Sequence, residues 1–158
     1  MPDHTQKVTG GCMCGAVRYV APAPHSVIYC HCRDCRRHTG APVVSFVGYP
    51  GSEIKWSGDA RQIYKSSTKV GRGFCGKCGT PLTWEEAGEE PGEAPGGGEI
   101  EIYIGTTDNP DDHAPTLHIW HDERIKWLET VDRLPRYHRW AHDGSEPYLH
   151  GPAGGTSD

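Results

Sequence analysis

The sequence lacks any apolar run that approaches the roughly 20 residues needed to span a membrane. Residues 1–7 also lack the apolar stretch of a secretory signal. We therefore expect a chain that stays in the reducing cytosol and has no membrane partner. In that compartment closely spaced cysteines are more often metal ligands than disulfides, and the odd count of seven cysteines favours metal as well.

The sequence also has no glycine-rich dinucleotide or phosphate loop. Its net charge is −5, but residues 85–99 supply six Glu and contain no Lys or Arg, so the remainder is close to neutral. A near-neutral remainder gives no basic surface, and we do not expect a nucleic-acid partner.

Apolar residues make up 35% of the 158-residue chain, which also contains 21 Gly and 13 Pro. A small, turn-rich core of this kind often needs a metal to hold it. We expect one domain over residues 9–140, after a flexible N-terminus of residues 1–8 and before a disordered tail of residues 141–158. Within the domain, residues 85–98 contain Glu, Gly, Pro and Ala alone, and this composition predicts a mobile acidic loop.

Strands outnumber helices in the pattern of the sequence, which predicts a mainly β fold with one or two short helical turns. Short apolar or alternating runs predict strands at residues 16–20, 27–29, 43–47, 82–84, 99–104 and 117–120. Residues 54–56 and 62–65 predict a hairpin that turns at residues 57–59. A helix is expected from residue 33 to residue 39, because Gly40 is placed to end it and Pro42 cannot continue it.

Four of the cysteines form two pairs, Cys12 with Cys14 and Cys75 with Cys78. Residues two apart in an extended segment share one face, and a glycine follows the second cysteine of each pair. Together the pairs would close one four-thiolate structural zinc site. In a competing arrangement, Cys75 and Cys78 join two cysteines of the remaining three.

Those three, Cys30, Cys32 and Cys35, lie within six residues. Catalytic zinc sites keep three protein ligands and an open position, where an incoming thiol can bind and lose its proton. A bound thiolate can then add to an aldehyde. In the alternative reading a histidine completes a second structural site. This histidine can be His31, which strand alternation disfavours because it points His31 away from the metal, or a different one such as His118 or His121.

Three arginines, Arg33, Arg36 and Arg37, give the segment around these cysteines a positive charge. Part of this charge can balance a zinc ion that carries three thiolates. The arginines can also bind the carboxylates of an anionic thiol such as glutathione, although for any one of them taken alone a solvated surface position is favoured.

Taken in order, these motifs resemble the glutathione-dependent formaldehyde-activating enzyme family, also called the centromere protein V domain. The resemblance runs from about Thr9 to about Tyr137. It is carried by Gly11-Cys12-Met13-Cys14-Gly15, Cys30-His31-Cys32-Arg33-Asp34-Cys35, Phe74-Cys75-Gly76-Lys77-Cys78-Gly79-Thr80, Leu117-His118-Ile119-Trp120 and Asp132-Arg133-Leu134-Pro135.

The resemblance implies a zinc-bearing β-tent of short antiparallel sheets with two zinc ions. It implies a structural zinc at Cys12, Cys14, Cys75 and Cys78, and a catalytic zinc at Cys30, Cys32 and Cys35. It also implies carbon–sulfur lyase chemistry, the reversible formation of S-(hydroxymethyl)glutathione from formaldehyde and glutathione. The acidic loop and the tail depart from the compact family pattern. A non-catalytic zinc-stabilised binding module is the alternative, and it predicts an exposed apolar patch and no thiol binding.

Overall fold

A computed structural model describes residues 6–88 and 95–148 of the chain. This part is mainly β with one α-helix, which confirms the predicted fold class. Where the sequence predicts one domain, backbone contacts divide the chain into two compact units. The first unit comprises Met1–Val27 and Ser45–Ala114, and the second comprises Ile28–Val44 and Pro115–Asp158. No helix of the described residues is long and apolar enough to cross a membrane.

The first unit contains a three-stranded antiparallel sheet in the order β1-β2-β5. Its strands are β1 (Val8–Gly11), β2 (Val17–Ala21) and β5 (Lys55–Gly58). Side chains alternate along β2, so that Val17, Tyr19 and Ala21 are buried. The buried Tyr19 hydroxyl is hydrogen-bonded to the Thr106 hydroxyl at 2.9 Å, which satisfies its polar end.

A second run of antiparallel strands in the first unit has the order β4-β9-β8-β7-β6. These strands are β4 (Val44–Pro50), β9 (Pro95–Tyr103), β8 (Pro81–Ala87), β7 (Val70–Phe74) and β6 (Gln62–Lys65). The core draws on both sheets and includes Val8, Tyr19, Val47, Tyr49, Ile100 and Ile102. Three short 3₁₀ helices complete the unit: η1 (Gly51–Glu53), η2 (Ile104–Thr106) and η3 (Pro110–Asp112).

The predicted hairpin between residues 54–56 and 62–65 is wrong. Strand β5 pairs with β2, whereas β6 pairs with β7 in the other sheet. Contacts outside the local sequence decide this outcome, because Trp56 packs edge-on against Tyr19 with ring centres 5.5 Å apart. The turn at Gly58 has φ of 77° and lies against Ala16, whose carbonyl oxygen a Cβ at residue 58 would meet at 2.2 Å.

The expected acidic loop at residues 85–98 is shorter in the structure. Residues 85–87 belong to β8 and residues 95–98 to β9, while residues 89–94 lie outside the described part. Pairing between β8 and β9 extends these strands, and a buried ion pair supports them. Glu85 is fully buried, and its carboxylate accepts two hydrogen bonds from Arg61, at 2.5 and 3.0 Å, and one from the Thr83 hydroxyl at 2.6 Å.

This ion pair provides a test of the fold. Replacing Arg61 with Met leaves the Glu85 carboxylate buried without its cation, so we expect the free energy of unfolding to fall by about 3–5 kcal/mol. The control is Arg18→Met, because Arg18 and Asp108 form an exposed pair that contributes at most about 1 kcal/mol. Urea denaturation of both variants gives the two values. Equal losses would contradict the structural role given to the buried pair.

Regular backbone structure begins earlier and ends later in the chain than the sequence predicts. Val8, expected in the flexible N-terminus, is buried and begins β1. Tyr148, expected in the disordered tail, exchanges two backbone hydrogen bonds with Arg136, at 2.9 and 3.0 Å. Residues 1–5 and 149–158, on which the rest of these two predictions falls, lie outside the described part.

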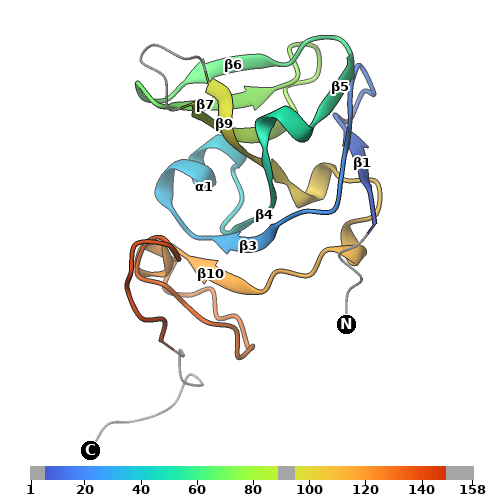
Figure 1. Cartoon of the computed structure of the whole chain (residues 1–158). Helices are drawn as coiled ribbons and strands as arrows, with labels where there is room; N and C mark the ends of the chain where they lie inside the picture. Colours follow the sequence, from blue (N-terminus) through green and yellow to red (C-terminus); the bar gives the residue numbers. More distant parts are fainter. Residues whose placement is uncertain (1–5, 89–94, 149–158) are drawn as a thin grey trace, which may run out of the picture. The chain divides into compact units, whose positions relative to one another are not determined.

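The second unit is built around the parallel pair of β3 (Ser26–Cys30) and β10 (Leu117–Ile119), which lie side by side in Figure 1. The helix α1 (Arg33–Thr39) follows β3 and ends at Gly40, whose φ is 75°, as the sequence predicts. The 3₁₀ helix η4 (His121–Glu123) follows β10. Cys30 ends β3, Cys32 and Cys35 lie at the start of α1, His118 lies in β10 and His121 begins η4.

Candidate metal centres

In the first unit, the structure brings together the four cysteines that the sequence pairs: Cys12, Cys14, Cys75 and Cys78. The Cys14 sulfur lies 3.5 Å from that of Cys12 and 3.9 Å from that of Cys75. Four thiolates around one zinc ion at about 2.3 Å have sulfurs about 3.8 Å apart, whereas a disulfide needs about 2.05 Å. All seven cysteines are free thiols. The spacing therefore fits a closed zinc site.

Two similar turns place these four sulfurs. In the first, Gly15 follows Cys14 with φ of 77° and donates its N–H to the Cys12 carbonyl. In the second, Gly79 follows Cys78 with φ of 76° and donates to the Cys75 carbonyl. A non-glycine residue rarely adopts this left-handed backbone, which is why a glycine follows each pair.

Hydrogen bonding and crowding shift the thiol pKa values in opposite directions. The Thr80 hydroxyl and backbone N–H lower the pKa of Cys78 to about 5. The Ala16 backbone lowers the pKa of Cys14, but the neighbouring sulfurs of Cys12 and Cys78 raise it to about 11. Four adjacent thiolates need a cation to coexist, and a zinc ion would supply that charge.

In the second unit, Cys30, Cys32 and Cys35 form a separate cluster. Cys30 ends β3, and Cys35 lies in α1 with its side chain buried. Cys32 is the N-cap of α1, and its sulfur accepts a hydrogen bond from the Cys35 N–H at 3.3 Å. The neighbouring Cys32 and Cys35 thiols, together with burial, raise the pKa of Cys30 well above its ordinary value.

No histidine of the described residues joins this three-cysteine cluster, so the reading in which His31, His118 or His121 completes it is not supported. The three histidines form a group of their own, in which all three side chains are buried. His31 points away from the thiols, as strand alternation predicts. The cluster thus offers three thiols to a metal ion, of which Cys32 is the partly exposed one.

The sequence does not predict that His118 and His121 come together, because strand alternation separates them. Trp120 lies between them in a left-handed conformation, with φ of 53° and ψ of 35°. This conformation ends the strand and turns the following residue back toward His118. A tryptophan gives no sequence signal for such a turn.

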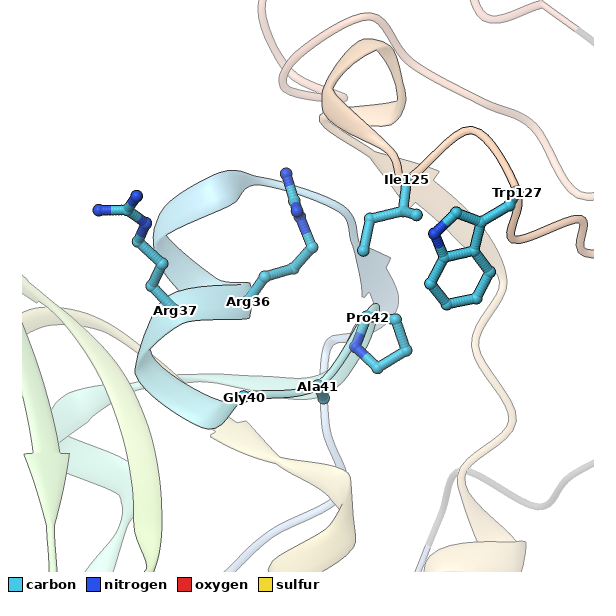
Figure 2. Close-up of a pocket in the computed structure, with 7 residues that line it drawn as sticks. All are labelled: Arg36, Arg37, Gly40, Ala41, Pro42, Ile125 and Trp127. Carbon is cyan, nitrogen blue, oxygen red and sulfur yellow. The ribbon is translucent and has the colours of Figure 1, made fainter.

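The three arginines have different surroundings. Arg36 is committed to the backbone, since its Nε donates to the His31 carbonyl and its Nη2 to the Glu123 carbonyl, both at 3.0 Å. Arg36 and Arg37 line a cavity of about 450 Å³, whereas Arg33 does not. The other lining residues are Gly40, Ala41, Pro42, Ile125 and Trp127. Figure 2 shows both arginines projecting from α1, with Ile125 and Trp127 on the opposite side.

The comparison with known families agrees with the cysteine geometry. Residues 7–123, which is more than half of the chain, match the family model described as "Glutathione-dependent formaldehyde-activating enzyme". The matched range contains all seven cysteines and ends within η4.

Proposed function

Because the chain belongs to the glutathione-dependent formaldehyde-activating enzyme family, we propose that it catalyses the reversible addition of a thiol such as glutathione to formaldehyde. In this carbon–sulfur lyase-type reaction, the thiol sulfur bonds to the aldehyde carbon, and the thiol proton ends on the aldehyde oxygen. The reverse direction cleaves the same carbon–sulfur bond. The seven free thiols fit the reducing cytosol that the sequence predicts.

The observation that carries this proposal is the three-cysteine cluster. Cys30, Cys32 and Cys35 would hold one zinc ion and leave a position for the substrate thiol, while Cys12, Cys14, Cys75 and Cys78 would hold a structural zinc. Zinc held by these three cysteines would lower the pKa of an added thiol and act as a Lewis acid. Cys30 and Cys35 are buried, whereas Cys32 is partly exposed. We therefore expect the substrate thiol to approach the site beside Cys32.

The cavity at α1 supplies the binding part of the proposal. Arg37 is exposed at the wall of this cavity, so its guanidinium can bind a substrate carboxylate in a bidentate manner. Arg36 already donates to two carbonyls and holds the His31 backbone, which gives it a positioning role. Ile125 and Trp127 add an apolar wall to the same cavity.

The direct experiment measures exchange between free glutathione and its hydroxymethyl adduct. Formaldehyde and glutathione are mixed at equilibrium, and the exchange rate is followed by NMR with and without the zinc-loaded protein. We expect the protein to raise the rate, and to lose this effect when zinc is removed by a chelator. An exchange rate unchanged by the protein would contradict the proposed function.

The arginine contact is tested by replacing Arg37 with Met. We expect the KM for glutathione to rise about tenfold with kcat unchanged, because a hydrogen-bonded charge contact to the substrate is lost. Arg33→Met is the matched control, since Arg33 is equally exposed on the same helix and does not line the cavity. The same KM increase in both variants would instead indicate a general effect of positive charge.

A second candidate, the non-catalytic binding module, is favoured by one observation. The side chain of Trp127 is 73% exposed and that of Val131 is 98% exposed, and exposed apolar residues of this size can contact a protein partner. The exchange experiment separates the two candidates, because a binding module does not change the rate.

A further inference from the structure

Three histidines in the second unit form a cluster that the proposed reaction does not use. One ring nitrogen of each of His31, His118 and His121 lies within 4.8 Å of those of the other two. Their ring centres are 4.9, 5.1 and 5.6 Å apart. Three imidazoles bound tetrahedrally to zinc, with Zn–N distances of about 2.1 Å, have ring centres roughly 5 Å apart. The rings thus have the spacing of a three-histidine metal site.

A carboxylate fixes the orientation of His118. The Nε2 of His118 lies 3.1 Å from an Asp132 oxygen, and Asp132 also accepts from Arg136 at 2.8 Å and from the Leu134 N–H at 2.9 Å. Because Asp132 is ionised, His118 donates from Nε2 and keeps its lone pair on Nδ1. This carboxylate–histidine arrangement is typical of metal ligands.

A hydroxyl fixes His121 in the same way. Its Nδ1 lies 2.8 Å from the Tyr148 hydroxyl, which in turn donates to Asp122 at 3.4 Å. The Tyr148 oxygen therefore accepts from His121 Nδ1–H, and the lone pair of His121 is on Nε2. Two of the three rings are thus held by outer partners that leave one lone pair each for a metal.

His118 and His121 are also uncharged. Burial lowers the pKa of His118, and burial with the nearby positive groups lowers the pKa of His121 to about 3. Neutral imidazole is the form that binds metal. The charged residues around the rings are the arginines Arg36, Arg124 and Arg136 and the acids Asp122, Glu123 and Asp132.

We propose that His31, His118 and His121 form a third metal site, which takes one divalent transition ion such as Zn²⁺ through three neutral imidazoles. Nitrogen donors of this kind suit Zn²⁺, Co²⁺, Ni²⁺ and Cu²⁺ rather than Mg²⁺ or Ca²⁺. The site is separate from both thiolate clusters and does not depend on the proposed reaction. A metal bound there would link His31 to His118 in β10 and to His121 in η4.

The ion replaces a hydrogen bond. His31 Nε2 donates to His118 Nδ1 at 2.8 Å, and the other ring nitrogen of His31, Nδ1, is buried and has no hydrogen-bond partner among the described residues. Two nitrogens on one tetrahedral zinc lie about 3.4 Å apart, so the rings must separate by about 0.6 Å. Binding moves the His31 proton from Nε2 to Nδ1, so that the imidazole stays neutral.

The test counts zinc ions. The full chain is refolded with excess Zn²⁺ and desalted, and zinc per chain is measured by elemental analysis. We expect three ions in the wild type and in the control His25→Gln, an exposed histidine of the first unit, but two ions in His121→Gln. The nitrogen contribution to the zinc X-ray absorption spectrum should fall in His121→Gln alone. Two ions in the wild type, or three in His121→Gln, would overturn the proposal.

A second variant covers the case in which His121→Gln does not fold. Tyr148→Phe keeps all three imidazoles and removes the hydroxyl that orients His121. We expect one zinc ion in this variant to be lost to a chelator at about tenfold lower chelator concentration than in the wild type. If all its zinc ions resist the chelator as they do in the wild type, the site is not the one proposed.

Discussion

Replacing Cys32 with Ser is expected to lower the rate of thiol–aldehyde exchange by at least about 100-fold, because a zinc ligand is lost and serine is a poor substitute for a thiolate. The helix should survive this change. Cys32 caps α1 by accepting a hydrogen bond from the Cys35 N–H, and serine is among the best N-cap residues. The variant therefore separates metal binding from folding.

Zinc content, circular dichroism and the NMR exchange rate are measured together for Cys32→Ser. We expect one zinc ion fewer than in the wild type and an unchanged spectrum. The control is Asp34→Asn, an exposed residue in the first turn of α1 that is not a ligand. If Cys32→Ser kept both its zinc content and its exchange rate, the assignment of the three-thiolate site would be wrong.

Replacing Cys75 with Ser is expected to unfold the first unit. A structural zinc contributes an apparent 10–16 kcal/mol, roughly, to the folding of small zinc domains, and this equals or exceeds the whole stability of a typical domain. Cys75 is buried and packs with Val17 and Leu82, so its loss removes a zinc ligand and leaves a hydroxyl among apolar side chains.

Thermal unfolding followed by circular dichroism tests this expectation. The wild type should unfold at a much lower temperature after zinc removal, and Cys75→Ser should be largely unfolded even with zinc. Met13→Ala is the control, because Met13 lies between two of the ligands but its side chain is 88% exposed. Its stability should stay within about 0.5 kcal/mol of the wild type. A cooperative wild-type-like transition in Cys75→Ser would show that this site does not hold the fold together.

Features that depend on neighbouring residues could be predicted from the sequence. The helix over residues 33–39 ends at Gly40 because that glycine adopts a left-handed backbone, which is a local property. The same holds for the two cysteine turns, where Gly15 and Gly79 follow the second cysteine. Cysteine spacing then restricts which thiols can share one metal, and the clusters in the structure agree with it.

Features that depend on distant residues could not be predicted. The pairing of β5 with β2 rests on the packing of Trp56 against Tyr19, which lie far apart in the sequence. The burial of Glu85 rests on Arg61, and a run of Glu and Gly gives no sign of that partner. The histidine cluster rests on the left-handed Trp120, an uncommon conformation for a residue of its size.

The central claim is that Cys30, Cys32 and Cys35 hold a metal ion with a position open to a thiol. Its most direct test uses protein in which Co²⁺ replaces zinc, since thiolate ligands give Co²⁺ a sulfur-to-metal absorption band in the near ultraviolet. Addition of glutathione should increase this band in the wild type and leave Cys32→Ser unchanged. A wild-type spectrum that glutathione does not alter would contradict an open thiol-binding position, and with it the proposed reaction.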